Sequence, residues 1–287
     1  MSLARKVLRN PKGFYSIQEA IDLTIKESKR IPNVYDVIIG VPRAGLLFAN
    51  IIASKYGRPL STPDNFVRGE FWYSQDQPIP KAMRAALIVD DSVSSGKTMK
   101  NSLEKIQKAF PNLLIHTASV FVEPQMKNSV NYALKVKKGP NLFEWNIMSA
   151  TWIYGPVIAD MDGVLCEECP ADFDDDGEKY VEWIKNAAPR LLPTYSLKAI
   201  VTARLEKYRE VTDTWLREHN VKYEQLIMLP VDTKQDRTFA KIINLKSGAV
   251  TATKPFWMWE SDPMEARQIY LKTLIPVLCI NTMTFLG

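Results

Sequence analysis

Largely apolar runs alternate with amphipathic segments along the whole chain. The first half has such runs at residues 34–41, 86–89 and 113–122, and segments with helical spacing at 17–25, 46–55 and 98–106. The same alternation restarts near residue 150, with apolar runs at 152–159, 198–201, 256–259 and 276–280. Continuous apolar runs separated by helices are typical of parallel sheets that are buried on both faces. We therefore expect an α/β protein of two domains, residues 1–150 and 151–287, each with a parallel sheet.

Composition narrows the class of protein. A length of 287 residues suits two domains, and 46% hydrophobic with 24% charged residues is ordinary for a soluble globular protein. The net charge of +5 is scattered, so charge alone does not indicate nucleic acid as a partner. No run of eighteen apolar residues and no apolar core behind the basic amino terminus is present, so we expect neither a membrane span nor a secretory signal. The expected location is the cytoplasm.

The three cysteines also indicate a reducing compartment. Cys166 and Cys169 form one C-x-x-C pair, and a zinc site would need two further soft ligands from Cys279, His116 and His219. A reduced pair of loop cysteines is the favoured interpretation.

The first candidate site follows the apolar run at 86–89. Asp90 and Asp91 stand at its carboxyl end, the edge at which open α/β sheets bind ligands. A hydroxyl-rich turn closed by Gly96 leads into the next helix, whose first N–H groups can hold a phosphate. The two carboxylates can accept hydrogen bonds from vicinal ribose hydroxyls. A Walker A loop is not favoured, since that motif needs glycine where Asp91 stands.

This stretch resembles the signature of the type I phosphoribosyltransferases for binding phosphoribosyl pyrophosphate (PRPP). Its order is four apolar residues, two acids, two looser positions, two small residues, Gly, any residue and Thr. The Pro-Arg-Ala-Gly turn at 42–45 resembles the loop that holds pyrophosphate in that family. The resemblance implies an enzyme that transfers phosphoribosyl from PRPP with Mg²⁺ to a nitrogenous base. It implies PRPP binding by Asp90, Asp91, Ser94, Ser95, Gly96, Lys97, Thr98, Arg43 and Ala44.

Residues 131–145 resemble the base-binding segment of xanthine/hypoxanthine-type members. This implies that Phe143 and Trp145 stack on the base and that Lys135 reads its exocyclic oxygen, while core packing of both aromatics is an equal alternative. The 6-oxopurine enzymes carry an Asp where this chain has Ser94, so the identity of the acceptor base stays open. Residues 60–82 are expected to form either a lid over PRPP or a β-hairpin with exposed aromatics.

The second candidate site follows the apolar run at 152–159, where Asp160 and Asp162 stand two residues apart. One such carboxylate can attack a phosphoryl group while the other handles a proton on the leaving group. The motif resembles the first one of the haloacid dehalogenase (HAD) superfamily. Thr202, after the strand at 198–201, matches the second motif, and Glu260 with Asp262 matches the fourth.

The third HAD motif is a lysine, and Lys241 is preferred, with Lys246 and Lys254 as alternatives. The resemblance implies Asp160, Asp162, Thr202 and Lys241 as catalytic residues. It implies Mg²⁺ as cofactor, bound by Asp160, Asp162, Glu260 and Asp262. Residues 166–197 leave room for a small cap at most.

The leading hypothesis is a bifunctional enzyme that joins a phosphoribosyltransferase to a HAD phosphatase. Its partners would be small molecules (PRPP, a nucleobase and a phosphomonoester), without nucleic acid or membrane, and the sequence is compatible with a homodimer. The alternative is a PRPP or nucleotide sensor that regulates the phosphatase, since Ser94 replaces an acid.

Overall fold

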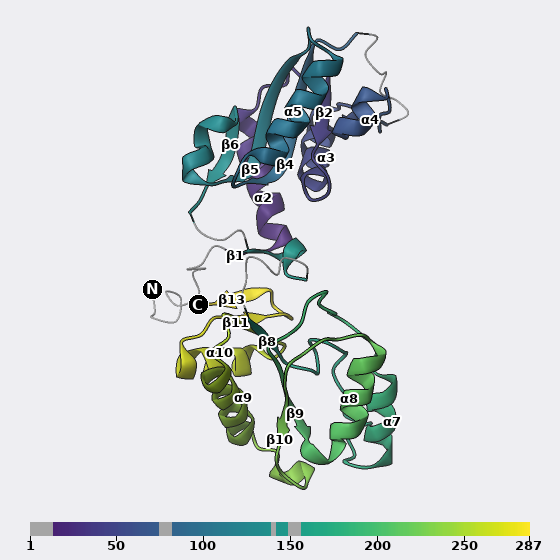
Figure 1. The fold of residues 1–287 in the computed structure, drawn as a ribbon, viewed down its shortest axis with the longest axis vertical. Helices are drawn as coiled ribbons and strands as arrows, with labels where there is room; N and C mark the ends of the chain where they lie inside the picture. The colour runs from purple at the N-terminus through teal and green to yellow at the C-terminus, as the bar shows by residue number, and fades with distance from the viewer. Residues whose placement is uncertain (1–13, 75–81, 139–141, 149–155) are drawn as a thin grey trace. The chain divides into compact units, whose positions relative to one another are not determined.

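The computed structural model describes residues 14–74, 82–138, 142–148 and 156–287 (Figure 1). The chain divides into two compact units. The amino-terminal unit is Tyr15–Trp145, and the carboxyl-terminal unit comprises Asn146–Gly287 together with Phe14. The boundary predicted from the sequence, between residues 150 and 151, falls within 149–155, outside the described residues.

The amino-terminal unit is built on a parallel sheet in the order β3-β2-β4-β5-β6. The central strand β4 (Ala85–Val93) pairs with β2 (Val37–Gly40) and β5 (Leu114–Val122). The outer strands are β3 (Leu60–Ser61) and β6 (Tyr132–Val136). Since successive side chains of a strand point to opposite faces, β4 contributes apolar residues to two separate cores.

Helices cover both faces of this sheet. The helices α2 (Ile17–Glu27) and α3 (Gly45–Tyr56) pack on one face, while α4 (Pro63–Val67) and α5 (Lys97–Ala109) pack on the other. A capping box starts α2, because the Ser16 side chain accepts from the Glu19 N–H and the Glu19 carboxylate accepts from the Ser16 N–H. The remaining short elements are η1 (Ser28–Arg30), η2 (Pro124–Ser129), β7 (Leu142–Phe143), η3 (Glu144–Asn146) and, at the unit boundary, β1 (Phe14–Tyr15).

The described part of residues 60–82 contains a short helix that neither the lid nor the hairpin expectation included, while Trp72 and Tyr73 are exposed, as the hairpin expectation had it. Thr62 caps α4 by accepting a hydrogen bond from the Asn65 N–H, and Pro63 occupies the first turn, so a short helix forms here. Leu60 and Trp72 form an isolated antiparallel bridge. Residues 75–81, the centre of the expected lid or hairpin, lie outside the described residues.

The carboxyl-terminal unit has a six-stranded sheet in the order β10-β9-β8-β11-β12-β13. The first five strands are parallel: β10 (Leu226–Leu229), β9 (Ala199–Leu205), β8 (Val157–Ala159), β11 (Trp257–Glu260) and β12 (Val277–Cys279). The apolar run at 276–280 forms β12, the last of the parallel strands. Outside it, β13 (Thr284–Leu286) adds an antiparallel edge strand.

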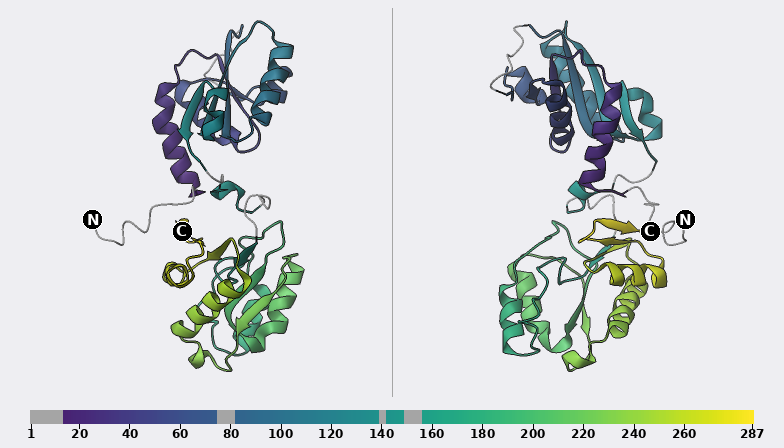
Figure 2. Two further views of the ribbon diagram at one scale, coloured as in Figure 1. Left: turned by 60° about the vertical axis from the view of Figure 1, so that its left-hand side comes forward. Right: turned by 180° about the vertical axis from the view of Figure 1, so that it is seen from behind.

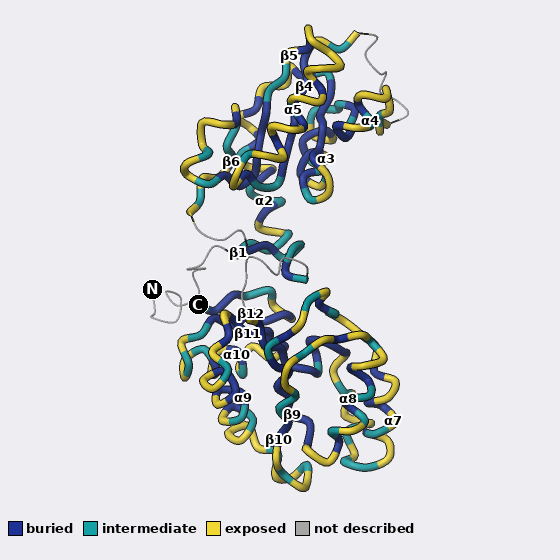
Figure 3. The backbone as a smooth tube through the Cα atoms, viewed as in Figure 1, coloured by how far each residue is buried: buried dark blue, intermediate teal, exposed yellow. Residues whose placement is uncertain are grey.

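The helices α9 (Phe239–Thr253) and α10 (Pro263–Thr273) pack on one face of this second sheet. The helices α7 (Glu178–Asn186) and α8 (Arg209–Glu218) lie on the other face, as Figures 1 and 2 show. The short helices η4 (Glu206–Tyr208) and η5 (Lys234–Asp236) complete the unit. The central strands of both sheets are buried (Figure 3). The predicted α/β class with parallel sheets is therefore confirmed.

None of the helices in the described part of the chain combines the length and the apolar content that a membrane crossing requires.

Candidate functional site

The first site is formed at the carboxyl end of β4, where Asp90 and Asp91 follow four buried apolar residues. The first turn of α3 approaches this end closely. A Cβ atom on Gly45 would lie 3.0 Å from the Asp90 Cα and Oδ1 atoms and 2.9 Å from the Val89 carbonyl oxygen. Only glycine therefore fits here. The preceding Arg43 is exposed, and its peptide bond with Pro42 is cis.

Burial and mutual repulsion disfavour the ionised forms of the acid pair. Burial raises the pKa of Asp90 to about 8, and the neighbouring Asp91 charge adds to the effect. Burial also raises the pKa of Asp91, against hydrogen bonds that favour its ionised form, including one from Trp145. A buried and a half-buried carboxylate side by side at this edge favour a ligand that brings hydrogen-bond donors or positive charge.

The raised pKa of Asp90 predicts a pH-dependent gain in stability for the Asp90→Asn variant. Between pH 4 and pH 8 the unfolded chain has released the Asp90 proton while the folded chain retains it, so the stability of the wild-type unit falls as the pH rises. The asparagine side chain of the variant does not titrate, so its stability should not fall with pH for this reason. Since one pKa unit corresponds to about 1.4 kcal/mol, we expect the variant to gain at least that amount over wild type between pH 5 and pH 8.

Scanning calorimetry of the full chain at both pH values measures this difference. Asp22→Asn, which neutralises an exposed carboxylate on α2, is the matched control and should show no such trend. An equal effect of Asp90→Asn at pH 5 and pH 8 would contradict the prediction.

The turn after the acid pair leads directly into α5. Gly96 is the N-cap residue of this helix with a φ of 73°, and no side chain caps the terminus. Gly96 has no side chain to cap α5, and the Lys97 N–H is 3.4 Å from the Ser95 hydroxyl oxygen, so this terminus combines N–H groups with a hydroxyl, a combination suited to a phosphate. The surrounding side chains are exposed: Ser94, Ser95, Lys97 and Thr98.

The residues expected to bind the base are not brought together as a base pocket. Lys135 is exposed on β6. Phe143 is fully buried, with Trp145 stacked 4.4 Å away and the Phe121 ring at 4.7 Å. The structure thus places Phe143 in the core, the alternative that the sequence left open. Lys137, which sequence reasoning missed, lies 5.3 Å from the Phe143 ring, and burial lowers its pKa to about 8.

Trp145 contacts the acid pair instead of facing an open pocket. Its indole Nε1–H donates to the Asp91 Oδ2 atom at 3.1 Å. The residues are 54 positions apart, and no local pattern in the sequence indicates this hydrogen bond.

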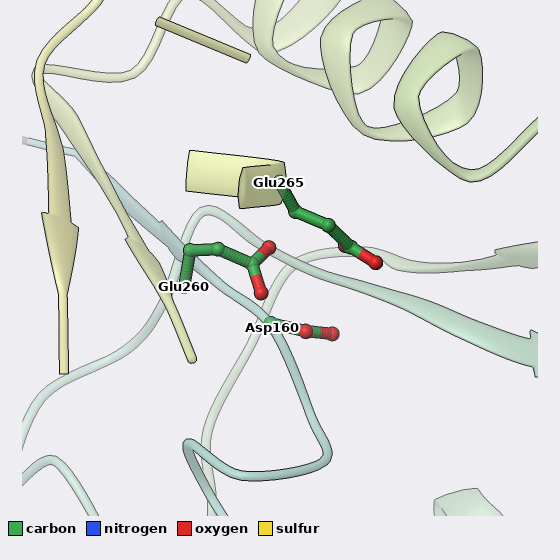
Figure 4. Close-up of side chains that lie close together, drawn as sticks. All are labelled: Asp160, Glu260 and Glu265. Atoms are coloured by element: carbon green, nitrogen blue, oxygen red, sulfur yellow. The ribbon is translucent and has the colours of Figure 1, made fainter. Parts of the chain in front are cut away.

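The second site is a buried cluster of three carboxylates around one ammonium group. Asp160 follows β8, Glu260 ends β11, and Glu265 lies in the first turn of α10 (Figure 4). One oxygen from each carboxylate lies within 4.8 Å of the others. The Lys246 Nζ atom, from α9, is 2.7 Å from Asp160, 2.8 Å from Glu260 and 2.6 Å from Glu265.

The sequence-based choice of Lys241 for this position is contradicted by the structure. Lys241 is exposed near the start of α9 and lies 3.8 Å from Asp236. Lys246, the alternative, is 2% exposed and faces the sheet. Five residues turn a helix by about 140°, so the two lysines cannot share a face.

The electrostatics of the cluster keep Lys246 charged. Burial alone would lower its pKa, but the charges of Asp160, Glu260 and Glu265 raise it well above the ordinary value. Burial and the Asp160 charge raise the pKa of Glu260, which Lys246 opposes. Both carboxylate oxygens of Glu260 accept hydrogen bonds. Oε1 accepts from the N–H groups of Ser261 and Asp262, and Oε2 accepts from Lys246.

Asp162 is held by an arginine that sequence reasoning missed. Arg204, in β9, is fully buried, and its Nε atom lies 3.1 Å from both Asp162 carboxylate oxygens while Nη2 lies 2.6 Å from Oδ1. Thr202, on the same face of β9, accepts from the Arg204 N–H at 3.1 Å. A charged residue two positions after Thr202 in an apolar strand is the signal that could have identified Arg204.

Asp262, expected as a metal ligand, has a different role in this structure. It is exposed, caps α10, and accepts at Oδ1 from the N–H groups of Met264 (2.7 Å) and Glu265 (2.9 Å). Glu265 joins the cluster in its place. Carboxylate oxygens are the ligands that Mg²⁺ prefers, so the donor set fits such an ion.

The cluster opens into a cavity of about 510 Å³. Asp160, Asp162, Lys246, Glu265, Tyr180 and Arg237 are among the residues that line it. Glu168 also borders the cavity, where burial and the Asp162 and Asp160 charges raise its pKa to about 7. Cys166 donates to Asp162, and the C-x-x-C cysteines are both free thiols.

Comparisons with known proteins identify the family of the first unit. The family model for the phosphoribosyl transferase domain matches residues 6–151, just over half of the chain. The chain therefore belongs to the phosphoribosyl transferase domain family, as the sequence predicted for its first half. No curated protein matches the chain.

Several solved structures are similar to part of the chain. The xanthine-guanine-hypoxanthine phosphoribosyltransferase of Helicobacter pylori is 17% identical, with 47% of this chain and 94% of that one covered at a TM-score of 0.37. A purine phosphoribosyltransferase from Pyrococcus horikoshii Ot3 is 22% identical, with coverages of 47% and 93% and a TM-score of 0.36. An orotate phosphoribosyltransferase from Aeropyrum pernix is 20% identical, with coverages of 37% and 57% and a TM-score of 0.27.

Proposed function

We propose that the amino-terminal unit binds PRPP with Mg²⁺ and transfers its phosphoribosyl group to a nitrogenous base. The observation that supports this most directly is the Asp90–Asp91 pair, which is followed by the glycine-capped amino terminus of α5. The carboxylates would accept from ribose hydroxyls, while the N–H groups of α5 would hold the 5′-phosphate. Arg43 and Ala44 would lie along the pyrophosphate.

Pyrophosphate release tests this proposal. The full chain is mixed with PRPP, Mg²⁺ and a panel of purine and pyrimidine bases, and release in the presence of one base supports transfer to that base. The second candidate is a non-catalytic PRPP sensor, favoured by Ser94 in place of an acid. If the chain binds PRPP but releases pyrophosphate with none of the bases, the result would support the non-catalytic sensor.

We propose that the carboxyl-terminal unit hydrolyses a phosphomonoester. The supporting observation is the Lys246 Nζ atom between Asp160 and Glu260 at strand ends, together with the resemblance to HAD motifs. A Mg²⁺ ion bound by Asp160 and Glu265, with Asp162 close by, would neutralise charge on the phosphoryl oxygens. Lys246 would reduce the repulsion between the Asp160 carboxylate and the phosphate.

The residues then divide the reaction into two steps. An Asp160 oxygen attacks phosphorus, the bond to the leaving oxygen breaks, and Asp162 gives that oxygen a proton. In the second step, water attacks the aspartyl-phosphate while Asp162 takes up a proton from the water. Arg204 holds the Asp162 carboxylate in place. Thr202, which the HAD resemblance implies as a phosphate ligand, is fully buried and would support the Arg204 backbone instead.

A pair of lysine variants tests this assignment within one helix. Lys246→Met should lower the hydrolysis of p-nitrophenyl phosphate by about 10²–10³-fold, because the phosphate and Asp160 lose their neutralising charge. It should also destabilise the unit, since three carboxylates lose their cation. Lys241→Met is the matched control and should keep the rate within about twofold.

Circular dichroism separates loss of activity from loss of fold. If Lys246→Met does not fold, Lys246→Arg provides the second measurement. It keeps the charge, but the guanidinium cannot place one atom among three carboxylates, so activity should still fall. Full activity in a folded Lys246 variant, or its loss in Lys241→Met, would contradict the assignment.

A further inference from the structure

The indole of Trp145 engages an atom that the proposed PRPP site needs. Its N–H donates to the Asp91 Oδ2 atom at 3.1 Å, and Asp91 is half-buried. The indole is fixed by its neighbours, because it stacks on Phe143 at 4.4 Å with a 9° angle between rings and meets Phe48 edge-on at 5.4 Å. This hydrogen bond is therefore a well-defined contact in the amino-terminal unit.

A ribose hydroxyl that donates to Asp91 competes with this indole. Besides Trp145, the Ser92 hydroxyl already lies 3.4 Å from the same Oδ2 atom. A carboxylate oxygen has two lone pairs, so one that already has two donors nearby has few positions left for a further donor. The indole hydrogen bond favours the ionised form of Asp91 and so lowers its pKa, against the effect of burial.

We propose that Trp145 occupies the acceptor position of Asp91 that a ribose hydroxyl takes, so that PRPP binds only when the indole moves away. Trp145 is in this way a residue that determines the affinity of the site for a ribose-bearing ligand. The inference rests on the proposed binding of PRPP by the amino-terminal unit.

The backbone next to Trp145 is held within the amino-terminal unit, because the Glu144 Oε2 atom accepts from the Ile17 N–H at 2.7 Å. We therefore expect a rotation of the Trp145 side chain, while this backbone stays in place.

Calorimetric titration of the full chain with PRPP and Mg²⁺ tests this inference. Trp145→Phe keeps an aromatic ring beside Phe143 but removes the N–H, and it should bind PRPP about tenfold more tightly than wild type. Trp215→Phe is the matched control, because it also removes an indole N–H, one that donates to the Ala187 carbonyl in the other unit. Its PRPP affinity should stay within about twofold of wild type.

The outcomes separate this inference from the proposed function. If wild type binds PRPP and Trp145→Phe binds equally or more weakly, the indole does not compete with ribose and the inference is wrong. If neither protein binds PRPP, the proposed function of the unit fails, and the inference fails with it. In ¹H–¹⁵N spectra the indole resonance that is lost in Trp145→Phe should also be the one that PRPP shifts most in wild type.

Discussion

Asp160→Asn is expected to abolish the phosphatase activity that we propose for the carboxyl-terminal unit. The amide cannot form the aspartyl-phosphate, and loss of a covalent nucleophile lowers turnover by at least about 10⁴-fold. The fold should survive, because the amide is nearly isosteric and Lys246 keeps its contacts with Glu260 and Glu265. Removing the Asp160 charge also relieves repulsion on Glu260, whose pKa it raises.

The turnover of p-nitrophenyl phosphate with Mg²⁺ measures this effect, with thermal unfolding as the check on the fold. Asp162→Asn provides a graded comparison and should slow turnover by about 10²–10⁴-fold, the usual contribution of general acid–base catalysis. Beryllium fluoride with Mg²⁺ should inhibit the wild-type protein as a mimic of the phosphorylated Asp160. Activity that persists in Asp160→Asn, or in excess EDTA, would refute the mechanism.

The second large effect is expected at the acid pair of the amino-terminal unit. The double variant Asp90→Asn with Asp91→Asn replaces two charged acceptors by neutral ones, and each charge-assisted hydrogen bond contributes roughly 1.5–3 kcal/mol. PRPP affinity should therefore fall by about 10²–10⁴-fold. The fold should be retained, because burial disfavours both charges in the empty protein.

Calorimetric titration with PRPP and Mg²⁺ measures the affinity, and hydrolysis of p-nitrophenyl phosphate is the internal control. That activity should be unchanged, since the proposed phosphatase residues all lie in the other unit. Unchanged PRPP affinity in the double variant would show that the acid pair does not bind the ribose.

The two sites differ in how far the sequence predicts them. The acid pair, Gly96 and the start of α5 lie within one stretch of chain, so an apolar strand, two acids and a glycine-closed turn predict their arrangement directly. The strand ends at Asp160 and Glu260 are predicted for the same reason: parallel strands bring their carboxyl ends to one edge of the sheet.

Contacts between elements distant in the sequence were not predictable in this way. The pattern of α9 admits several lysines, and only its packing against the sheet selects Lys246 over Lys241. The spacing of the fourth motif indicates Asp262. In the structure Asp262 is the N-cap of α10 and does not join the carboxylate cluster. Glu265, one turn further along the helix, lies beside Asp160 instead.

The sequence by itself therefore determined the α/β class, the family of the first half and the strand ends that carry the acids, since each depends on short-range pattern. The tertiary structure alone decided which groups meet those acids. Arg204 reaches Asp162 across 42 residues, Lys246 reaches Asp160 across 86, and Trp145 reaches Asp91 across 54. A buried carboxylate must find a donor or a cation, but its own sequence neighbourhood does not say which residue the fold will bring there.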